Sequence, residues 1–253
     1  MKPSNFAEAP DMITHAQKLS GNRIIKQFRG KTSNIYIIED YGEKASFLID
    51  CGMPSDAENL LAALSYELPV KKIVCTHFHV DHVAGWAVLK ELWKDCSIFF
   101  HENAMPYVTG DKRIPVPAFS DIQSTLIPCM KEYGYFLNFK DILSGALYGT
   151  PFKKGFPPER AEYYKDKEPV IPGFMTIHTP GHRPDSVSFL EPESGVFVSG
   201  DFLLVIGGKV VINSYVSSKK DQDNSVKLIK SIKEIKYIYP GHGIYVPFNT
   251  DSL

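Results

Sequence analysis

The chain of 253 residues lacks the features that mark several specialised classes of protein. No apolar run approaches the roughly 18 residues that a membrane-spanning helix needs, and residues 1–20 hold no apolar core of a secretory signal. The four cysteines are far apart and form no Cys-x-x-Cys pair, which argues against a disulfide scaffold and a cysteine-based zinc finger. We therefore expect a cytoplasmic protein that does not bind a membrane.

Neither sign of charge is in excess. Lys and Arg total 28 against 29 Asp and Glu, so the formal net charge is −1. This balance provides no overall attraction to nucleic acid, and we expect no nucleic-acid partner. Hydrophobic residues make up 43% of the chain, which is enough to bury a large core.

Short apolar runs of strand length recur and alternate with amphipathic helical patterns. The predicted helices span Asp56–Glu67, with Ser55 and Glu58 as a capping pair, Val83–Lys94 and Asp223–Ile235. Helices with one apolar stripe cover the outer faces of sheets, so a layered α/β fold is predicted. The predicted strands are Arg23–Phe28, Asn34–Glu39, Ser46–Ile49, Lys72–Cys75, Ser97–Phe100, Met175–Ile177, Val187–Leu190, Val196–Ser199, Lys209–Ile212 and Tyr237–Tyr239.

Residues from about 105 to 172 interrupt this pattern. Nine of the 18 prolines lie between Pro106 and Pro172, and nine aromatic residues lie between Tyr133 and Tyr164. We expect a single domain over residues 1–253 with an insertion at about 105–172, which has one or two helices within residues 120–148. Its aromatic side chains either pack the insertion onto the domain, form a wall of the substrate pocket or make a homodimer contact.

The most informative segment is the run His77-Phe78-His79-Val80-Asp81-His82. Imidazole and carboxylate groups are ligands that suit zinc and similar transition ions. Alternate spacing on a turn directs His77 and His79 to one point, while Asp81 and His82 face another. The run therefore predicts half of a site for two metal ions.

A site for two metals needs further ligands, at least one of them able to bridge. His182, Asp201 and His242 each follow the end of a predicted strand, and each comes directly after a glycine that permits a tight turn. Strand ends at one sheet edge can converge, so these side chains are candidate ligands. Asp50 also ends a strand and is the candidate for orienting a ligand histidine.

Taken in order, these motifs resemble the signature of the metallo-β-lactamase superfamily, which is Asp, His-x-His-x-Asp-His, Gly-His, Gly-Asp and Gly-His. The resemblance spans roughly Asn34 to His242. It implies a four-layer αβ/βα sandwich that holds the metals between the sheet ends, with Asp201 as the bridging ligand. It also implies that His77, His79 and His182 hold the first metal and that Asp81, His82 and His242 hold the second.

Two cations close together lower the pKa of the water between them, so the predicted nucleophile is a metal-bridging hydroxide. Asp81 is the predicted catalytic residue, because it can orient the hydroxide and carry its proton. We expect two divalent ions, with zinc favoured over iron or manganese. The expected reaction is hydrolysis of a small-molecule carbonyl substrate.

The motifs say less about the leaving group of the substrate and about how it is protonated. Residues 202–204, which follow Asp201, are Phe, Leu and Leu and cannot donate a proton. A thiolate, whose conjugate acid has a pKa of about 8.5, leaves without such help, so a thioester is favoured over a lactone or other ester. Tyr215 and Asn213 lie beyond the next strand and stay candidates to reach the site.

Within the family, the nearest branch is hydroxyacylglutathione hydrolase, or glyoxalase II. Only Gly243–Leu253 follow the last motif, so we expect no C-terminal glutathione-binding domain and hypothesise that the insertion supplies the substrate pocket. The alternative function is a persulfide dioxygenase with one iron, and a nuclease or phosphodiesterase is less favoured. We expect no metal at His15, His101 or His178, which lie outside the motifs.

Overall fold

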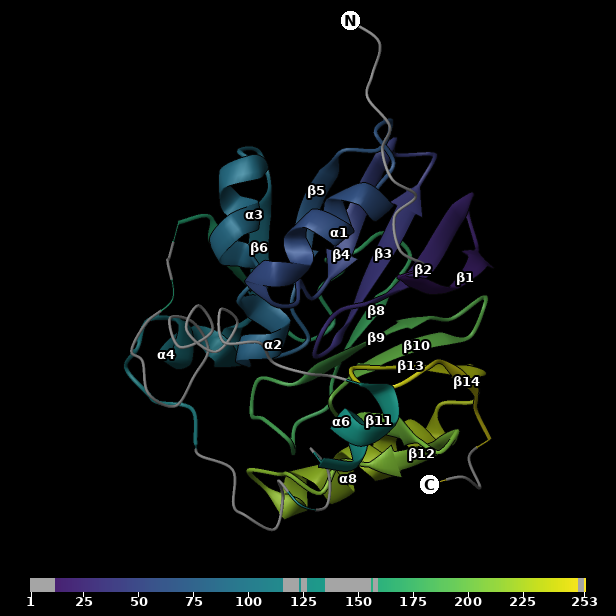
Figure 1. The fold of residues 1–253 in the computed structure, drawn as a ribbon. Coiled ribbons are helices and arrows are strands. Elements are labelled where there is room, and N and C mark those ends of the chain that lie inside the picture. The colour runs from purple at the N-terminus through teal and green to yellow at the C-terminus, as the bar shows by residue number, and fades with distance from the viewer. Residues whose placement is uncertain (1–11, 116–122, 124–126, 135–155, 157–158, 250–252) are drawn as a thin grey trace, which may run out of the picture.

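A computed structural model of the chain describes residues 12–115, 123, 127–134, 156, 159–249 and 253. In these residues two β-sheets lie against each other, and helices cover their outer faces (Figure 1). Helices α1 (Ala57–Ala63) and α3 (Trp86–Leu92) cover the larger sheet, and α8 (Lys219–Ser231) covers the smaller one. The predicted four-layer αβ/βα sandwich is confirmed.

The larger sheet has seven strands in the order β1-β2-β3-β4-β5-β6-β7. Strands β1 to β4 are antiparallel, whereas β4 to β7 are parallel. The edge strand β7 lies inside the segment that we predicted to be an insertion and was not expected as a strand. The bounds are β1 Ile13–Leu19, β2 Arg23–Arg29, β3 Asn34–Asp40, β4 Ala45–Ile49, β5 Val70–Val74, β6 Ser97–His101 and β7 Ala161–Tyr164.

The smaller sheet has five strands in the order β14-β13-β10-β9-β8. Its central pair, β10 and β13, is parallel, and its other neighbours are antiparallel. A separate hairpin, β11–β12, turns at Gly207 and Gly208, whose positive φ values of 60° and 70° suit a tight two-residue turn. The bounds are β8 Met175–His178, β9 Val187–Glu191, β10 Val196–Gly200, β11 Leu203–Ile206, β12 Lys209–Ile212, β13 Tyr237–Pro240 and β14 Val246–Pro247.

Hydrophobic side chains fill three layers, one in each space between the four layers of structure. Along β3, Ile35 and Ile37 belong to the core beneath α1 and α3, whereas Tyr36 and Ile38 belong to the core between the sheets. A third core, which includes Ile229 of α8, fills the space behind the smaller sheet. Burial on both faces explains why central strands such as β4 and β10 are almost continuously apolar. Each of the ten predicted strands is present, with ends shifted by at most two residues.

The predicted helices are present, but their ends differ from the prediction. The capping pair of Ser55 and Glu58 is wrong: helix η1 precedes α1, and the Asp56 carboxylate accepts the Met53 N–H at 2.8 Å instead. Helix α8 begins four residues before the predicted start, where the Ser218 hydroxyl accepts the Asp221 N–H at 3.3 Å. The remaining helices are η1 Pro54–Asp56, α2 Val80–Val83, η2 Glu102–Ala104, α4 Met105–Val108 and α6 Ile127–Tyr133.

The helix predicted over Val83–Lys94 is shorter than expected and corresponds to α3, which spans Trp86–Leu92. The separate helix α2 ends at Val83, and between the two helices Gly85 lies against the backbone that follows β4. A Cβ atom on Gly85 would lie 2.0 Å from the carbonyl oxygen of Cys51. This close approach requires glycine and fixes the short helix α2, which carries Asp81 and His82, beside the end of β4.

Much of the predicted insertion lies outside the described residues, including residues 135–155. Within its described part, α6 falls in the range 120–148 where we predicted helix. In the part of the chain that the structure describes, no helix is long and apolar enough to cross a membrane.

Candidate metal centre

The candidate ligands lie where strands of both sheets end, at one edge of the sandwich. The parallel pairing of β10 with β13 sets Gly200 opposite Pro240, and the Gly241 N–H donates to the Gly200 carbonyl at 2.8 Å. This pairing brings Asp201 and His242 together. The placements are Asp50 after β4, His77 to His82 after β5, His182 after β8, Asp201 after β10 and His242 after β13.

The first group of ligand atoms comes from His77, His79, His182 and Asp201. The Nδ1 atom of His79 lies 3.1 Å from the Nε2 atom of His77 and 3.1 Å from that of His182. The Asp201 Oδ2 atom lies 3.8 Å from His77 Nε2 and 3.7 Å from His182 Nε2. Ligand atoms of a tetrahedral zinc site are separated by roughly 3.3–3.6 Å, since the metal–ligand bonds are roughly 2.0–2.2 Å long. The group fits one such ion.

The second group contains Asp81, His82 and His242. The Asp81 Oδ2 atom lies 3.5 Å from His242 Nε2 and 3.8 Å from His82 Nε2. Asp201 faces this group as well, with its Oδ1 atom 3.3 Å from His82 Nε2 and its Oδ2 atom 3.3 Å from His242 Nε2. The Asp201 carboxylate therefore lies between the two groups, as a bridging ligand must.

Two buried atoms in this arrangement test whether a metal fits. His82 Nε2 and Asp201 Oδ1 are both buried and lie 3.3 Å apart, but neither makes a hydrogen bond of good geometry within the described residues. A buried polar atom without a partner is costly, and an ion shared by the imidazole and the carboxylate would satisfy both atoms. Together with the nitrogen and oxygen donors, this unmet need indicates that the residues fit divalent transition ions.

The electrostatics of the two groups differ. Burial lowers the pKa values of His77, His79 and His182, which keeps these imidazoles neutral and able to bind metal. Burial also acts to lower the pKa values of His82 and His242, but the nearby carboxylates, Asp201 foremost with Asp81 and, for His82, Asp50, together outweigh it and raise both. Protons and metal ions therefore compete for the second group.

Asp50 has the position that we predicted for a residue that orients a ligand. Its Oδ2 atom lies 2.7 Å from His82 Nδ1, which directs His82 Nε2 toward Asp201. Thr76 holds the carboxylate in place, because its backbone N–H donates to Oδ1 at 2.7 Å and its hydroxyl to Oδ2 at 2.8 Å. A carboxylate bonded to a ligand histidine in this way fixes the ring orientation.

Tyr215 and Asn213 both reach the centre. The Tyr215 carbonyl oxygen lies 2.6 Å from His182 Nδ1, and its ring stacks on His79 with centroids 6.0 Å apart. The Asn213 amide donates to the Asp201 carbonyl at 2.9 Å. The Tyr215 hydroxyl donates to the Pro115 carbonyl at 3.1 Å. Both residues thus support ligands.

Asp185 was not identified from the sequence. Its Oδ2 atom accepts the Phe78 N–H at 2.7 Å, and this bond ties the loop that follows His182 to the turn between His77 and His79. The buried Arg183 guanidinium lies beside it, with Nε 3.4 Å from Asp185 Oδ1. The only sequence signal was an acidic residue three positions after a candidate ligand, which is too common to carry a prediction.

We expect the substitution Asp50→Asn to weaken metal binding. The amide keeps the size of the side chain but removes the charge that holds His82, and loss of such a partner costs about 10–100-fold in metal affinity. Competition with a chromophoric chelator measures this loss. The control is Asp40→Asn, because Asp40 is a buried aspartate at the far end of β3, where it accepts the Gly42 and Glu43 N–H groups. Equal affinities for the two variants would contradict the role of Asp50.

The comparison with known families identifies the chain. Residues 29–242 match the family model described as the metallo-beta-lactamase superfamily. The chain belongs to the metallo-beta-lactamase superfamily. This membership agrees with the four-layer fold and with the convergence of histidines and aspartates at the sheet ends.

Relatives within the metallo-beta-lactamase superfamily are distant. The chain is 28% identical to a probable metallo-hydrolase, YflN, of Bacillus subtilis over 202 residues, which cover 77% of this chain and 70% of that protein. It is 22% identical to a hydroxyacylglutathione hydrolase of Legionella pneumophila over 201 residues, which cover 79% of this chain and 59% of that enzyme. The chain is thus similar to metal-dependent hydrolases, and it spans little more than half of the second one.

Solved structures show the same fold. The protein TTHA1623, solved in a di-iron-bound form, has a TM-score of 0.57 and 24% identity, with 87% of this chain and 91% of that chain covered. ETHE1 from Myxococcus xanthus has a TM-score of 0.54 and 18% identity, with coverage of 88% and 79%. These likenesses place the chain in the metallo-beta-lactamase fold.

Proposed function

We propose that the protein is a hydrolase that uses two divalent metal ions to cleave a small-molecule carbonyl compound, with thioesters preferred over lactones and other esters. The observation that carries the proposal is the Asp201 carboxylate, which faces ligand atoms of both groups at 3.3–3.8 Å. A site for a single ion needs only the first group. The intact second group of Asp81, His82 and His242 supports a pair of ions.

The bound ions would supply a hydroxide near neutral pH and polarise the carbonyl oxygen of the substrate. The protein contributes the proton acceptor. Asp81 is the more exposed of the two ligand carboxylates, with 22% of its side chain accessible against 9% for Asp201. Its carboxylate can therefore reach the incoming nucleophile, orient it and take up the proton released on attack.

The preference for thioesters rests on the surroundings of Asp201. Phe202, Leu203 and Leu204 are buried and apolar, so they offer no proton to a leaving group. The Tyr215 hydroxyl already donates to the Pro115 carbonyl. An alkoxide would leave such a site slowly, whereas a thiolate, with a conjugate-acid pKa of about 8.5, leaves without protonation. The similarity to a hydroxyacylglutathione hydrolase supports the same substrate class.

Elemental analysis combined with a substrate panel tests this function. We expect two metal ions in the candidate centre of each chain, zinc in preference to iron or manganese. We also expect hydrolysis of simple acyl thioesters faster than of matched lactones, oxygen esters and phosphodiesters. The competing function is a persulfide dioxygenase that holds one iron through His77, His79, His182 and Asp201, the first group of ligands. One iron per chain together with thiol-dependent oxygen uptake would replace our proposal with that function, and phosphodiester cleavage would replace it with a nuclease.

A further inference from the structure

A second cluster of metal-binding side chains lies apart from the candidate centre. His101 ends β6, Asp166 lies two residues beyond β7, and His178 ends β8, so the cluster joins the larger sheet to the smaller one. Asp166 Oδ1 lies 2.8 Å from His101 Nε2 and 3.7 Å from His178 Nδ1. These distances bracket the roughly 3.3–3.6 Å between neighbouring ligand atoms of a tetrahedral site.

The hydrogen bonds of His178 show which of its nitrogens is free to bind. Its Nε2 atom lies 2.9 Å from the Pro184 carbonyl oxygen, to which it donates its proton. The Asn103 amide also donates to this carbonyl, at 3.2 Å, and lies farther from His178 Nε2, at 3.5 Å. The Nδ1 atom of a neutral His178 therefore carries a lone pair, and it faces the Asp166 carboxylate. A cation between these two acceptors would be bound by both of them.

The ligand histidines of the candidate centre are held in the same way as His178. His182 bonds to the Tyr215 carbonyl through one ring nitrogen and turns the other to the metal position. A bond from the far nitrogen to a carbonyl or carboxylate is the usual support of a metal-bound histidine, since it fixes the tautomer and the ring. His178 has this support from Pro184.

His101 completes the group from the buried side. Its side chain is 2% exposed, and its ring stacks on that of His178 with centroids 4.5 Å apart. Without an ion, His101 Nε2 can donate a proton to Asp166, and an ion would replace this proton. The other nitrogen, Nδ1, accepts the Asn103 N–H at 3.4 Å and so caps η2. An ion bound at Nε2 would move the proton of a neutral ring to Nδ1 and replace this long bond.

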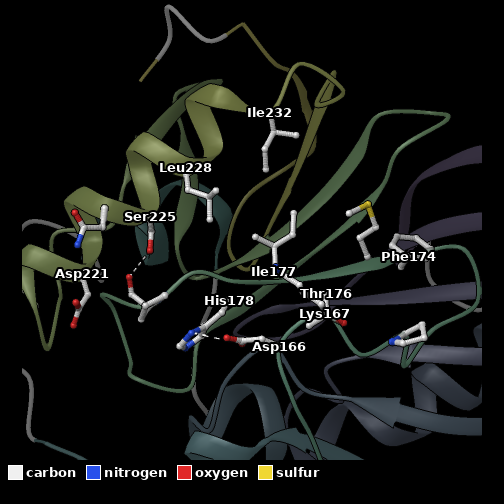
Figure 2. Close-up of a pocket in the computed structure, with 14 residues that line it drawn as sticks. Asp166, Lys167, Phe174, Thr176, Ile177, His178, Asp221, Ser225, Leu228 and Ile232 are labelled. Carbon is white, nitrogen blue, oxygen red and sulfur yellow. Dashed lines mark hydrogen bonds and ion pairs between the residues drawn. The ribbon is translucent and has the colours of Figure 1, made fainter.

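The cluster is accessible from solvent. Asp166 and His178 line a pocket of about 680 Å³ between β8 and α8, and Figure 2 shows the two side chains pointing toward each other at its wall. The Asp166 side chain is 54% exposed and that of His178 is 23% exposed. An ion can therefore enter through the pocket and keep water on its open side.

We propose that His101, Asp166 and His178 form a further site for one divalent transition-metal ion, separate from the candidate centre. Two imidazoles and one carboxylate favour zinc and its neighbours over magnesium or calcium, which prefer oxygen ligands. The ion would fasten the ends of β6 and β7 to β8, and the loop after β8 carries His182. From the sequence we expected no metal at His101 or His178, because capping or core hydrogen bonds explain a histidine at a strand end. Their partner Asp166 lies 65 positions from His101, in the predicted insertion.

Zinc titration of the zinc-loaded full chain, freed of excess metal by gel filtration, tests this site. Counting the zinc retained after gel filtration together with that taken up in calorimetry, we expect wild-type protein to bind one more ion per chain than Asp166→Asn or His178→Gln, or to bind it at least about tenfold more tightly. Asp221→Asn is the matched control, because Asp221 lines the same pocket and lies outside the cluster. It should bind zinc as the wild type does. Equal stoichiometry and affinity in all four proteins would overturn the proposal.

A measurement on the wild type alone covers the case in which a variant fails to fold. Diethyl pyrocarbonate modifies accessible imidazoles, and mass spectrometry follows the rate at His178. Zinc added beyond the equivalents held by the centre should slow this modification severalfold, while His15, which lies outside all three ligand groups, keeps its rate. An unchanged rate at His178 would refute the site. The result is independent of whether the protein is a hydrolase.

Discussion

The substitution Asp201→Ala should remove bound metal from both ligand groups and abolish hydrolysis. Asp201 contributes Oδ2 to the first group and faces the second with both oxygens, so its loss opens both coordination spheres at once. We expect the two ions of the centre to be lost, and kcat/KM to fall at least about 10³-fold, which corresponds to about 4 kcal/mol of transition-state stabilisation. Elemental analysis and thioester hydrolysis measure the two effects.

Two further variants separate the loss of a ligand from a loss of folding. Asp201→Asn keeps the volume of the side chain and one neutral oxygen donor, so it should fold and should bind metal more weakly than the wild type. Asp40→Ala removes a buried carboxylate far from the centre and should keep full metal content even if stability falls. An Asp201→Ala protein that holds both ions and retains activity would refute the bridging assignment and, with it, the observation that carries the proposed two-metal arrangement.

The layers of the fold could be predicted because they depend on local patterns. Strands such as β3 and β10 are apolar on both faces and are bounded by turn residues, so their presence and type follow from the sequence. The helix ends could not be predicted in the same way. Helix α3 begins at Trp86 rather than at the predicted Val83, because the backbone of Gly85 packs against Cys51, and a contact across 34 positions leaves no local signal.

The residues of the candidate centre also fall into two sets, those that local sequence patterns predict and those whose roles depend on tertiary structure. His182, Asp201 and His242 each follow a strand end and a glycine, so the sequence places them as ligands before any distance is known. Asp185 and Asp166 show no such pattern. Their partners, Phe78 for the first and His101 for the second, become neighbours only when the sheets pack, so these roles depend on tertiary structure.

We expect Gly241, the glycine before His242, to be as necessary for metal binding and activity as a metal ligand. A Cβ atom on Gly241 would lie 2.1 Å from Asp201 Oδ1 and 2.9 Å from the carbonyl carbon of Gly200. The backbone cannot move aside easily, because the Gly241 N–H donates to the Gly200 carbonyl and its own carbonyl accepts the Asn34 N–H, both at 2.8 Å. In Gly241→Ala the Asp201 carboxylate must therefore move away from the position between the two ligand groups.

We expect Gly241→Ala to lower kcat about 10²-fold, which is the usual consequence of moving a reacting group by about 1 Å, and to weaken metal binding. Overpacking should also lower the free energy of unfolding by about 1–3 kcal/mol. The control is Gly207→Asn in the β11–β12 turn, where a Cβ atom meets nothing within 4 Å and asparagine tolerates the positive φ. This control should keep metal and activity. If Gly241→Ala kept wild-type metal affinity and kcat, Asp201 would not need its observed position, and the metal ligands would have to be reassigned.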